Sequence, residues 1–281
     1  MKPLIVIFGI TGDLSRRKLI PALSAIAESG TVDEFEVLGI SRRELGVGEL
    51  VGETLAPRTS SMTMDLSDAQ AYEQLAKRCE INNDRSVIFY LSVPPLAVEP
   101  ITRSLARAGF SRPNVKLLLE KPFGIDEVSA REMATLLSES FDETQLYRID
   151  HYLAKEMAQN IIAFRAGNAM FAHMWNHDII DRVEIDAIEK IDIEGRGEFY
   201  EQTVSMRDVM QGHLMQLLSL VLCDLPEDLT WLSMPRLRAR ALSKIAPVLP
   251  QESIRAQYEG YDEEVKNPGS RTEAFVSVEL H

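Results

Sequence analysis

The sequence predicts an α/β domain built on a doubly wound parallel sheet, followed by an α+β domain with a largely antiparallel sheet. Short apolar, β-branched runs alternate with helix-forming segments up to about Ile149, which is typical of a parallel sheet with helices on both faces. A glycine turn directly follows the first apolar run, and beyond Ile149 helix-forming segments occur together with two segments, residues 183–188 and 273–280, that alternate with period two. We therefore expect domains at residues 1–149 and 150–281.

The first domain begins with an apolar run at residues 4–8, which is typical of a strand buried on both faces. Helix-forming residues follow from Leu14 to about Ser29 and end at Gly30. The later elements that we expect are strands at residues 35–40, 86–91 and 115–120 and a helix at residues 68–79. In such a sheet, ligands bind at the carboxyl ends of the strands.

The second domain should contain helices and antiparallel strands. We expect one helix from His151 to about Gly167 and another over residues 207–223, where apolar residues recur at helical spacing. Residues 183–188 and 273–280 alternate with period two, which predicts strands with one solvent-exposed face. We expect this sheet to be incomplete, because the last strand ends beside His281 and leaves an open edge.

The composition excludes several classes of protein. Thirty basic and 43 acidic residues give a formal charge of −13, so we expect neither nucleic acid nor an anionic membrane surface as a partner. The apolar run at residues 4–10 is too short to span a bilayer and lacks the cleavage site of a signal peptide. Cys79 and Cys223 are the only cysteines, which favours a reducing cytoplasm. No histidine or cysteine cluster has metal-ligand spacing, so we expect no metal.

The first strand is followed by a turn that is suited to a nucleotide. The glycines of this turn allow backbone amides to approach a pyrophosphate at the start of the next helix, as in a Rossmann-type domain. After the second strand comes Arg42, whose charge suits a ribose 2′-phosphate and therefore NADP. A solvated turn arginine is the alternative, and it describes Arg43 better. The turn residues that we expect to contact the cofactor are Gly9, Thr11, Gly12, Asp13 and Leu14.

Residues 148–156 place an acid, an imidazole, a phenol and an ammonium close together in sequence, at Asp150, His151, Tyr152 and Lys155. If a helix begins near Asp150, His151 and Lys155 lie four residues apart on one face. Their donors then converge on one anion beside a helix N-terminus. The segment is thus equipped to bind a phosphorylated, hydroxylated ligand. A solvated, charged helix start is the alternative.

Four blocks of sequence, at residues 7–14, 120–124, 148–156 and 207–214, occur in this order. Together they resemble glucose-6-phosphate dehydrogenase, and the resemblance runs to about Leu280. The family continues past the point where this chain stops, so we expect the chain to be C-terminally short relative to it. The resemblance implies NADP-dependent oxidation of glucose 6-phosphate to 6-phosphogluconolactone, the first step of the oxidative pentose phosphate pathway.

The resemblance also implies a general base. His213 would remove the proton of the C1 hydroxyl while hydride leaves C1 for the nicotinamide, and Asp150 would orient the imidazole. The alternative is a partly buried core histidine, because His213 has apolar neighbours at helical spacing. Gly212 replaces the asparagine that we would expect there, which loosens the helix by about 0.5–1 kcal/mol relative to alanine.

Further roles are implied by the same resemblance. Ser92 would contact the cofactor, and the alternative is that it belongs only to a rigid turn. Lys18 and Glu189 would contact the substrate, and the alternative is that their side chains are solvated. The Lys121–Pro122 bond is typically cis in the family, which would fix Lys121 between cofactor and sugar. The residues that would bind the substrate are Lys121, His151, Tyr152, Lys155, Glu189, Asp208 and Lys18. Those that would contact the cofactor, besides the glycine turn and Arg42, are Ser92, Pro94 and Lys121.

Two other functions remain as alternatives. A Glu-Lys-Pro strand end also occurs in other NAD(P)-dependent sugar oxidoreductases, although those enzymes do not need the blocks at residues 148–156 and 207–214 together. The chain could instead be a non-catalytic NADP-binding fragment or a partial subunit. We accordingly expect glucose 6-phosphate as the small-molecule partner, and either a homo-oligomer or a complementary C-terminal polypeptide as the protein partner.

Overall fold

The computed structural model describes residues 2–32, 34–44, 46–81, 85–121, 123, 124, 126–189, 193, 195, 197–226 and 228–281. The chain forms two compact units, Met1–Ile149 and Asp150–His281. Among the described residues, no helix combines the length and the apolar character that crossing a bilayer requires.

Unit 1 is built on a six-stranded sheet in which all neighbouring strands run parallel. The strand order is β3-β2-β1-β4-β5-β6, the order of a doubly wound Rossmann-type sheet. The predicted fold class is therefore confirmed for this unit. The strands are β1 (Leu4–Phe8), β2 (Glu36–Ser41), β3 (Thr59–Thr63), β4 (Val87–Leu91), β5 (Val115–Leu119) and β6 (Leu146–Arg148).

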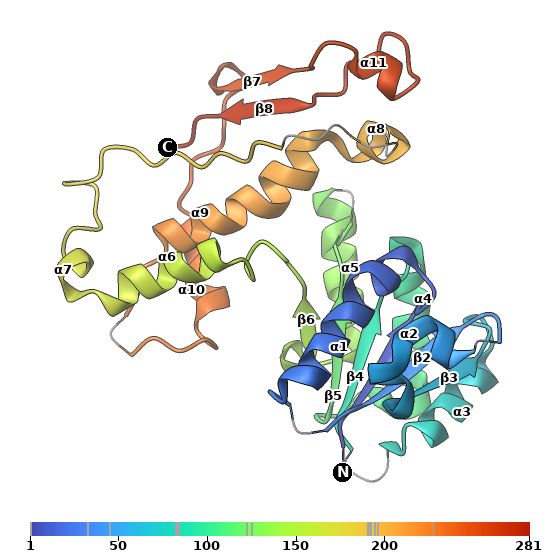
Figure 1. Ribbon diagram of the computed structural model, residues 1–281. Helices are drawn as coiled ribbons and strands as arrows, with labels where there is room; N and C mark the ends of the chain where they lie inside the picture. Colours follow the sequence, from blue (N-terminus) through green and yellow to red (C-terminus); the bar gives the residue numbers. More distant parts are fainter. Residues whose placement is uncertain are drawn as a thin grey trace. The chain divides into compact units, whose positions relative to one another are not determined.

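Helices cover both faces of this sheet (Figure 1). Because successive side chains of a strand point to opposite faces, β1 supplies both cores. Ile7 packs with Ile20 on the face of α1 and α2, whereas Phe8 packs with Leu75 and Leu105 on the face of α3, α4 and α5. The helical elements are η1 (Ser15–Leu19), α1 (Ile20–Ser29), α2 (Val47–Leu55), η2 (Ala56–Arg58), α3 (Ala69–Arg78), α4 (Pro95–Leu105), η4 (Ala106–Phe110), α5 (Glu127–Ser140) and η5 (Glu143–Gln145).

The sheet reverses its direction of winding between β1 and β4. These two strands are neighbours, but the chain leaves β1 toward the face of α1 and leaves β4 toward the face of α4. A crevice opens at such a point, beyond the carboxyl ends of the strands. The segments that follow β1 and β4 begin at Gly9 and Ser92, so both lie where a ligand of this sheet is expected.

Unit 2 combines helices with a small antiparallel sheet, as predicted for an α+β unit. Its core joins α6, α9 and α10 through Ile162, Leu220 and Met234, and β7 pairs with β8 in antiparallel register. The elements are α6 (Glu156–Gly167), α7 (Ala169–Ala172), α8 (Gly197–Ser205), η6 (Met206–Leu214), α9 (Met215–Leu222), α10 (Met234–Leu242), η7 (Pro250–Glu252), β7 (Ser253–Ala256), α11 (Tyr261–Glu264) and β8 (Phe275–Val278).

The strand predicted at residues 183–188 is wrong, because residues 181–189 form no regular secondary structure. Apolar and polar side chains alternate in this segment, as they do in a strand with one buried face. A strand also needs a neighbouring strand that satisfies its backbone hydrogen-bonding groups. In the described part of unit 2, β7 and β8 pair with each other. The strand predicted at residues 273–280 is confirmed as β8.

Candidate active site

The glycine turn after β1 has a geometry that admits no side chain at its first position. Gly9 has φ 76°, and its carbonyl accepts the amide of Gly12 at 2.9 Å. A Cβ on Gly9 would lie 2.2 Å from the carbonyl oxygen of Ser92. Any substitution must therefore separate the turn after β1 from the turn after β4. The two turns thus pack directly against each other at the carboxyl end of the sheet.

Ser15 joins these two turns from the start of the following helix. Its hydroxyl donates to the carbonyl of Gly9 at 2.9 Å and also bonds to the hydroxyl of Ser92 at 3.2 Å. Ser15 is fully buried, so both contacts replace hydration that it has lost. Ser15 is not among the residues predicted from the sequence, although its place at the start of the helix that follows the glycines was a usable signal.

The predicted turn residues stand where the helical stretch of η1 and α1 begins. Thr11 and Gly12 are half-buried, whereas Asp13 and Leu14 are exposed. Such a helix start presents amides and a positive dipole end to an anion. Asp13 pairs with Arg17 at 2.8 Å on the open surface, where ion pairs contribute little. Lys18 is exposed on η1.

Three further strands end beside this turn. Arg42 is exposed directly after β2, Ser92 follows β4, and half-buried Lys121 follows β5. Because β2, β1, β4 and β5 are consecutive neighbours, these residues and Gly9 line one edge of the sheet. Pro94, at the N-cap of α4, is also exposed there. Pro122 lies outside the described residues, and so does the expectation of a cis bond before it.

Tyr90 anchors the chain next to Lys121. The Tyr90 hydroxyl, on β4, donates a hydrogen bond to the carboxylate of Glu120. Burial raises the pKa of Tyr90, and the bond to Glu120 raises it further, so the phenol remains a donor. Neither residue was predicted to have a role in the site, although a phenol within an otherwise apolar strand was a signal.

In unit 2, His213 and Asp150 form a buried pair. His213 Nδ1 lies 2.8 Å from Asp150 Oδ1, and the two side chains are 7% and 11% exposed. The same carboxylate oxygen accepts the amide of Tyr152 at 2.9 Å. Two bonds therefore fix Asp150, and Asp150 in turn fixes the imidazole. With Nδ1 donating to the carboxylate, Nε2 of a neutral imidazole is left as a proton acceptor.

Three more predicted residues surround this pair. The Tyr152 ring stacks on the His213 ring, with centroids 4.1 Å apart and an interplanar angle of 17°. Lys155 Nζ lies 3.5 Å from the centroid of the Tyr152 ring. The His151 ring meets the His213 ring edge-on at 4.6 Å. The structure thus brings Asp150, His151, Tyr152, Lys155 and His213 into one cluster.

The predicted helix start near Asp150 is wrong. Residues 151–154 form turns, and α6 begins at Glu156 with Lys155 in extended conformation at its N-cap. The Asp150 carboxylate binds the backbone amide two residues ahead, which competes with helix formation. His151 and Lys155 therefore do not share a helix face. Their proximity arises from the turns and from contacts with Tyr152.

The two carboxylates predicted to bind sugar hydroxyls differ in their surroundings. Asp208 is half-buried in the first turn of η6, the helix that carries His213. Glu189 is exposed in the irregular segment 181–189. η6 is π-helical, a conformation that is frequent at functional sites.

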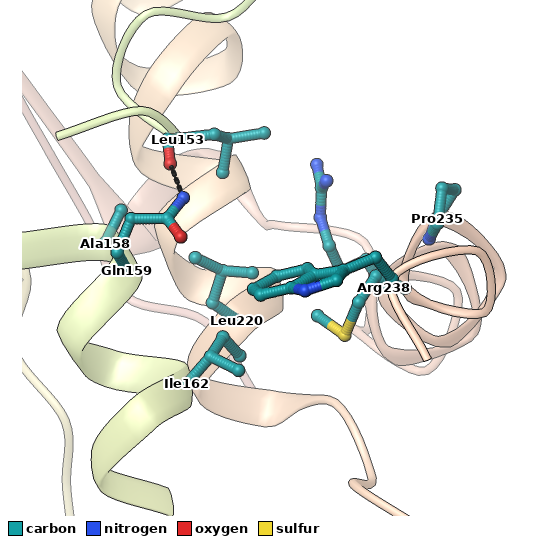
Figure 2. Close-up of a pocket in the computed structure, with 9 residues that line it drawn as sticks. Leu153, Ala158, Gln159, Ile162, Leu220, Pro235 and Arg238 are labelled. Atoms are coloured by element: carbon teal, nitrogen blue, oxygen red, sulfur yellow. Dashed lines mark hydrogen bonds between the residues drawn. The ribbon is translucent and has the colours of Figure 1, made fainter. Parts of the chain in front are cut away.

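An apolar hollow of about 200 Å³ lies between α6, α9 and α10 (Figure 2). Arg238 lines it and donates to Ser219 and Gln216 of α9. Burial lowers the pKa of Arg238, and the charge of Asp150 opposes this shift. The hollow is smaller than typical ligand pockets, and neither His213 nor Asp150 lines it. We therefore place the candidate site at the histidine cluster.

The fold and these side chains define a class: a Rossmann-type unit with a glycine turn after its first strand, followed by an α+β unit with a buried His–Asp pair. Residues 6–54 and 49–160 match the family model described as glucose-6-phosphate dehydrogenase, NAD binding domain. Residues 162–281 match the model of the glucose-6-phosphate dehydrogenase C-terminal domain. The chain therefore belongs to the glucose-6-phosphate dehydrogenase family, which confirms the resemblance of the four sequence blocks.

Individual relatives agree with this assignment. Glucose-6-phosphate 1-dehydrogenases of Chlamydia muridarum and Helicobacter pylori (strain J99) are each 34% identical to the chain over 98% of its length. The alignments span 63% and 67% of those relatives. The crystal structure of the Mycobacterium avium enzyme matches with a TM-score of 0.88 at 31% identity, over 99% of this chain and 64% of that one. A glucose-6-phosphate dehydrogenase in complex with glucose 6-phosphate matches with a TM-score of 0.90 at 25% identity, over 99% of this chain and 65% of that one.

Proposed function

We propose that the chain oxidises glucose 6-phosphate to 6-phosphogluconolactone with NADP as the hydride acceptor, the first step of the oxidative pentose phosphate pathway. Residues 1–149 form its cofactor domain and residues 150–281 its substrate domain. The observation that carries the proposal is the buried His213–Asp150 pair, in a chain of this family.

The residues at the sheet edge fit a dinucleotide. The glycine turn, whose backbone carries no side chain at Gly9 or Gly12, suits a pyrophosphate that approaches backbone amides. Exposed Arg42 suits the 2′-phosphate, and Lys121 and Ser92 follow strands on the nicotinamide side of the turn. When bound, the nicotinamide supplies the acceptor for the hydride from C1. The protein's task is to orient the sugar and hold its proton.

The proton of the C1 hydroxyl passes to Nε2 of neutral His213 as the C1–H bond breaks and the C1–O bond becomes a carbonyl. Asp150 keeps Nδ1 as a donor and stabilises the imidazolium once it forms, the role of the acid in a histidine dyad. His151, Tyr152 and Lys155 bind the 6-phosphate, because they add cationic and hydroxyl donors beside the base. Asp208 and Glu189 accept hydrogen bonds from sugar hydroxyls, and we also assign Lys18 and Lys121 to substrate binding.

Two measurements on the purified chain test this proposal. Calorimetry should show NADP binding more tightly than NAD, and NADPH absorbance should rise with glucose 6-phosphate but much less with glucose. The unphosphorylated sugar is the control for the phosphate site, because it retains the C1 hydroxyl. Equal use of both sugars would favour the other NAD(P)-dependent sugar oxidoreductases instead.

A further inference from the structure

Two imidazoles and a carboxylate converge in unit 2. One nitrogen each of His151 and His213 and one oxygen of Asp150 all lie within 4.8 Å of one another. Two of these residues are adjacent in sequence, and the third comes from η6. Transition metals are commonly bound by this combination of nitrogen and oxygen ligands. Metal binding would be a second function of these residues, separate from their proposed roles in binding and oxidising the sugar phosphate.

The separations match those of a tetrahedral ion after small movements. With bonds of about 2.0–2.2 Å, neighbouring ligand atoms of tetrahedral zinc stand about 3.3 Å apart. His213 Nδ1 and Asp150 Oδ1 are at 2.8 Å, slightly closer than this, and the largest separation in the group is no more than 4.8 Å. An ion that binds both atoms replaces the hydrogen bond between them. By this geometry, the distance between Nδ1 and Oδ1 then increases by less than about 1 Å.

Two of the ligands are already held in place. The His213 and Asp150 side chains are 7% and 11% exposed, and the Tyr152 amide bonds to the ligating carboxylate. Supporting bonds of this kind orient metal ligands. The third ligand, His151, is exposed, and its ring already meets the His213 ring edge-on. The group therefore combines a buried pair with one exposed side chain.

We propose that Asp150, His151 and His213 bind one divalent transition-metal ion, with Zn²⁺ as the representative ligand. Two imidazoles and one carboxylate suit zinc, whereas Mg²⁺ and Ca²⁺ require mainly oxygen ligands. Three protein ligands leave one coordination position open for water. An ion on Nδ1 leaves the proton of the neutral imidazole on Nε2, the nitrogen that the proposed reaction needs as a base, so metal binding and turnover exclude each other.

One neighbouring charge opposes the ion. Lys155 Nζ lies 3.5 Å from the centroid of the Tyr152 ring, and that ring stacks on His213. The Lys155 ammonium and the His213 imidazole must lie on opposite faces of the Tyr152 ring, because one face has no room for both groups. Lys155 is therefore a nearby like charge for any cation at the site, and its removal strengthens metal binding.

The test is a calorimetric titration of the full 281-residue chain with Zn²⁺, in chelator-free buffer without sugar or nucleotide. We expect one ion per chain. His151→Ala should weaken binding at least about tenfold, the effect that loss of even a supporting residue commonly has. Lys155→Met should tighten it by about two- to tenfold. Co²⁺ in place of Zn²⁺ should give the visible bands of a tetrahedral site, and His151→Ala should lose them.

His177→Ala is the matched control, because His177 is exposed and lies 3.3 Å from Asp178 but is not part of the three-ligand group. Its Zn²⁺ affinity should equal that of the parent chain. Absence of a single site, equal affinity in His151→Ala, or loss of binding in His177→Ala instead would overturn the proposal. His151 is exposed, so its variant should keep the parent circular dichroism melt. Since no substrate is present, failure of the proposed reaction leaves this result unaffected.

Discussion

At the scale of single residues, the burial of His213 and Asp150 needs an explanation. A polar side chain that is 7% exposed loses most of its hydration, and it must recover that loss through a partner. Asp150 supplies the partner, although 63 positions separate the two residues in sequence. An apolar residue would fill the same place without needing such a pair. The pair therefore favours a chemical role for His213 over the alternative of a core histidine.

Replacement of His213 by asparagine tests this role. His213→Asn should lower kcat by about 10²–10⁴ while NADP affinity stays unchanged, since the residue acts on the substrate proton. NADPH absorbance and calorimetry measure the two quantities. The control is His173→Asn, an exposed histidine of unit 2. Near-normal turnover of the His213 variant would show that another group is the base.

Arg42 tests the choice of cofactor. Arg42→Ala removes a charge-assisted contact worth about 1.5–3 kcal/mol, so NADP affinity should fall roughly ten- to a hundredfold while NAD affinity barely changes. Calorimetric titration with each dinucleotide measures this. Arg43→Ala is the matched control, because both side chains are exposed in the same turn. If the Arg42 variant weakens both cofactors equally, the 2′-phosphate contact is wrong.

The sequence names the residues of the cluster but not their arrangement. The motif around Asp150 predicts an anion site because donors crowd into a few residues, and that is a local property. The stacking of Tyr152 on His213 depends on where η6 packs, which no local pattern contains. For the same reason, a search for metal-ligand spacing along the chain could not find the group of Asp150, His151 and His213.

At the scale of elements, the approach to the candidate base carries backbone strain. Val204 has φ 60° and ψ 151°, at the end of α8 just before η6. This region of backbone conformation is essentially restricted to glycine, and occupying it costs about 1–3 kcal/mol. A β-branched residue is especially unfavourable there. The helix that carries His213 is therefore entered through a strained turn.

Val204→Gly should relieve this strain and raise the free energy of unfolding by about 1 kcal/mol, after allowance for the greater freedom of glycine in the unfolded chain. Urea denaturation followed by circular dichroism measures the change. Thr203→Gly, the adjacent position, is the control and should instead destabilise the fold by about 0.5 kcal/mol. A lower free energy of unfolding in Val204→Gly than in the parent chain would contradict the claim that Val204 is strained.

Glu201 joins α8 to the segment that carries α11. Its carboxylate accepts hydrogen bonds from Tyr261 at 3.0 Å, Asn267 at 2.6 Å and Ser270 at 2.8 Å. Burial opposes ionisation, but these donors outweigh it and hold the pKa of Glu201 below its usual 4.5. The ionised carboxylate is therefore the form that stabilises the fold.

This arrangement predicts a dependence of stability on pH. Because the pKa is lower in the folded state, the contribution of Glu201 is complete above pH 4.5 and is lost as pH falls through the folded value. Glu201→Gln should lower the melting temperature at pH 7 and flatten its decline in acid. Thermal melts at several pH values measure this, with exposed Glu198→Gln as the control. Parallel melting curves for Glu201→Gln and the parent would count against the network.

The elements that the sequence predicted are those with a strong apolar period. Strands β1, β2, β4 and β5 are buried, and their apolar runs identified them. β3 has the polar sequence TSSMT and β6 has three residues, so neither gave a periodic signal. Pairing with β2 and β5 makes them strands, and this is tertiary information.

At the scale of the whole molecule, each unit has a core of its own. In unit 1, residues from both faces of the sheet pack against its own helices, and in unit 2 α6, α9 and α10 pack together. A unit with its own core can fold alone. The glycine turn at Gly9, exposed Arg42 and the end of β5 all belong to unit 1, so cofactor binding should belong to it as well.

Residues 1–149 expressed alone should therefore unfold in one cooperative step and bind NADP within about threefold of the full chain. The matched control is the fragment of residues 1–145. This fragment lacks β6, the strand that pairs with β5, and therefore also lacks the buried side chain of Leu146. Loss of this side chain and of its pairing should lower the free energy of unfolding by about 2–3 kcal/mol. Urea denaturation and NADP calorimetry on both fragments decide the matter. If residues 1–149 fail to fold or to bind NADP while the full chain does both, the cofactor domain does not end at Ile149.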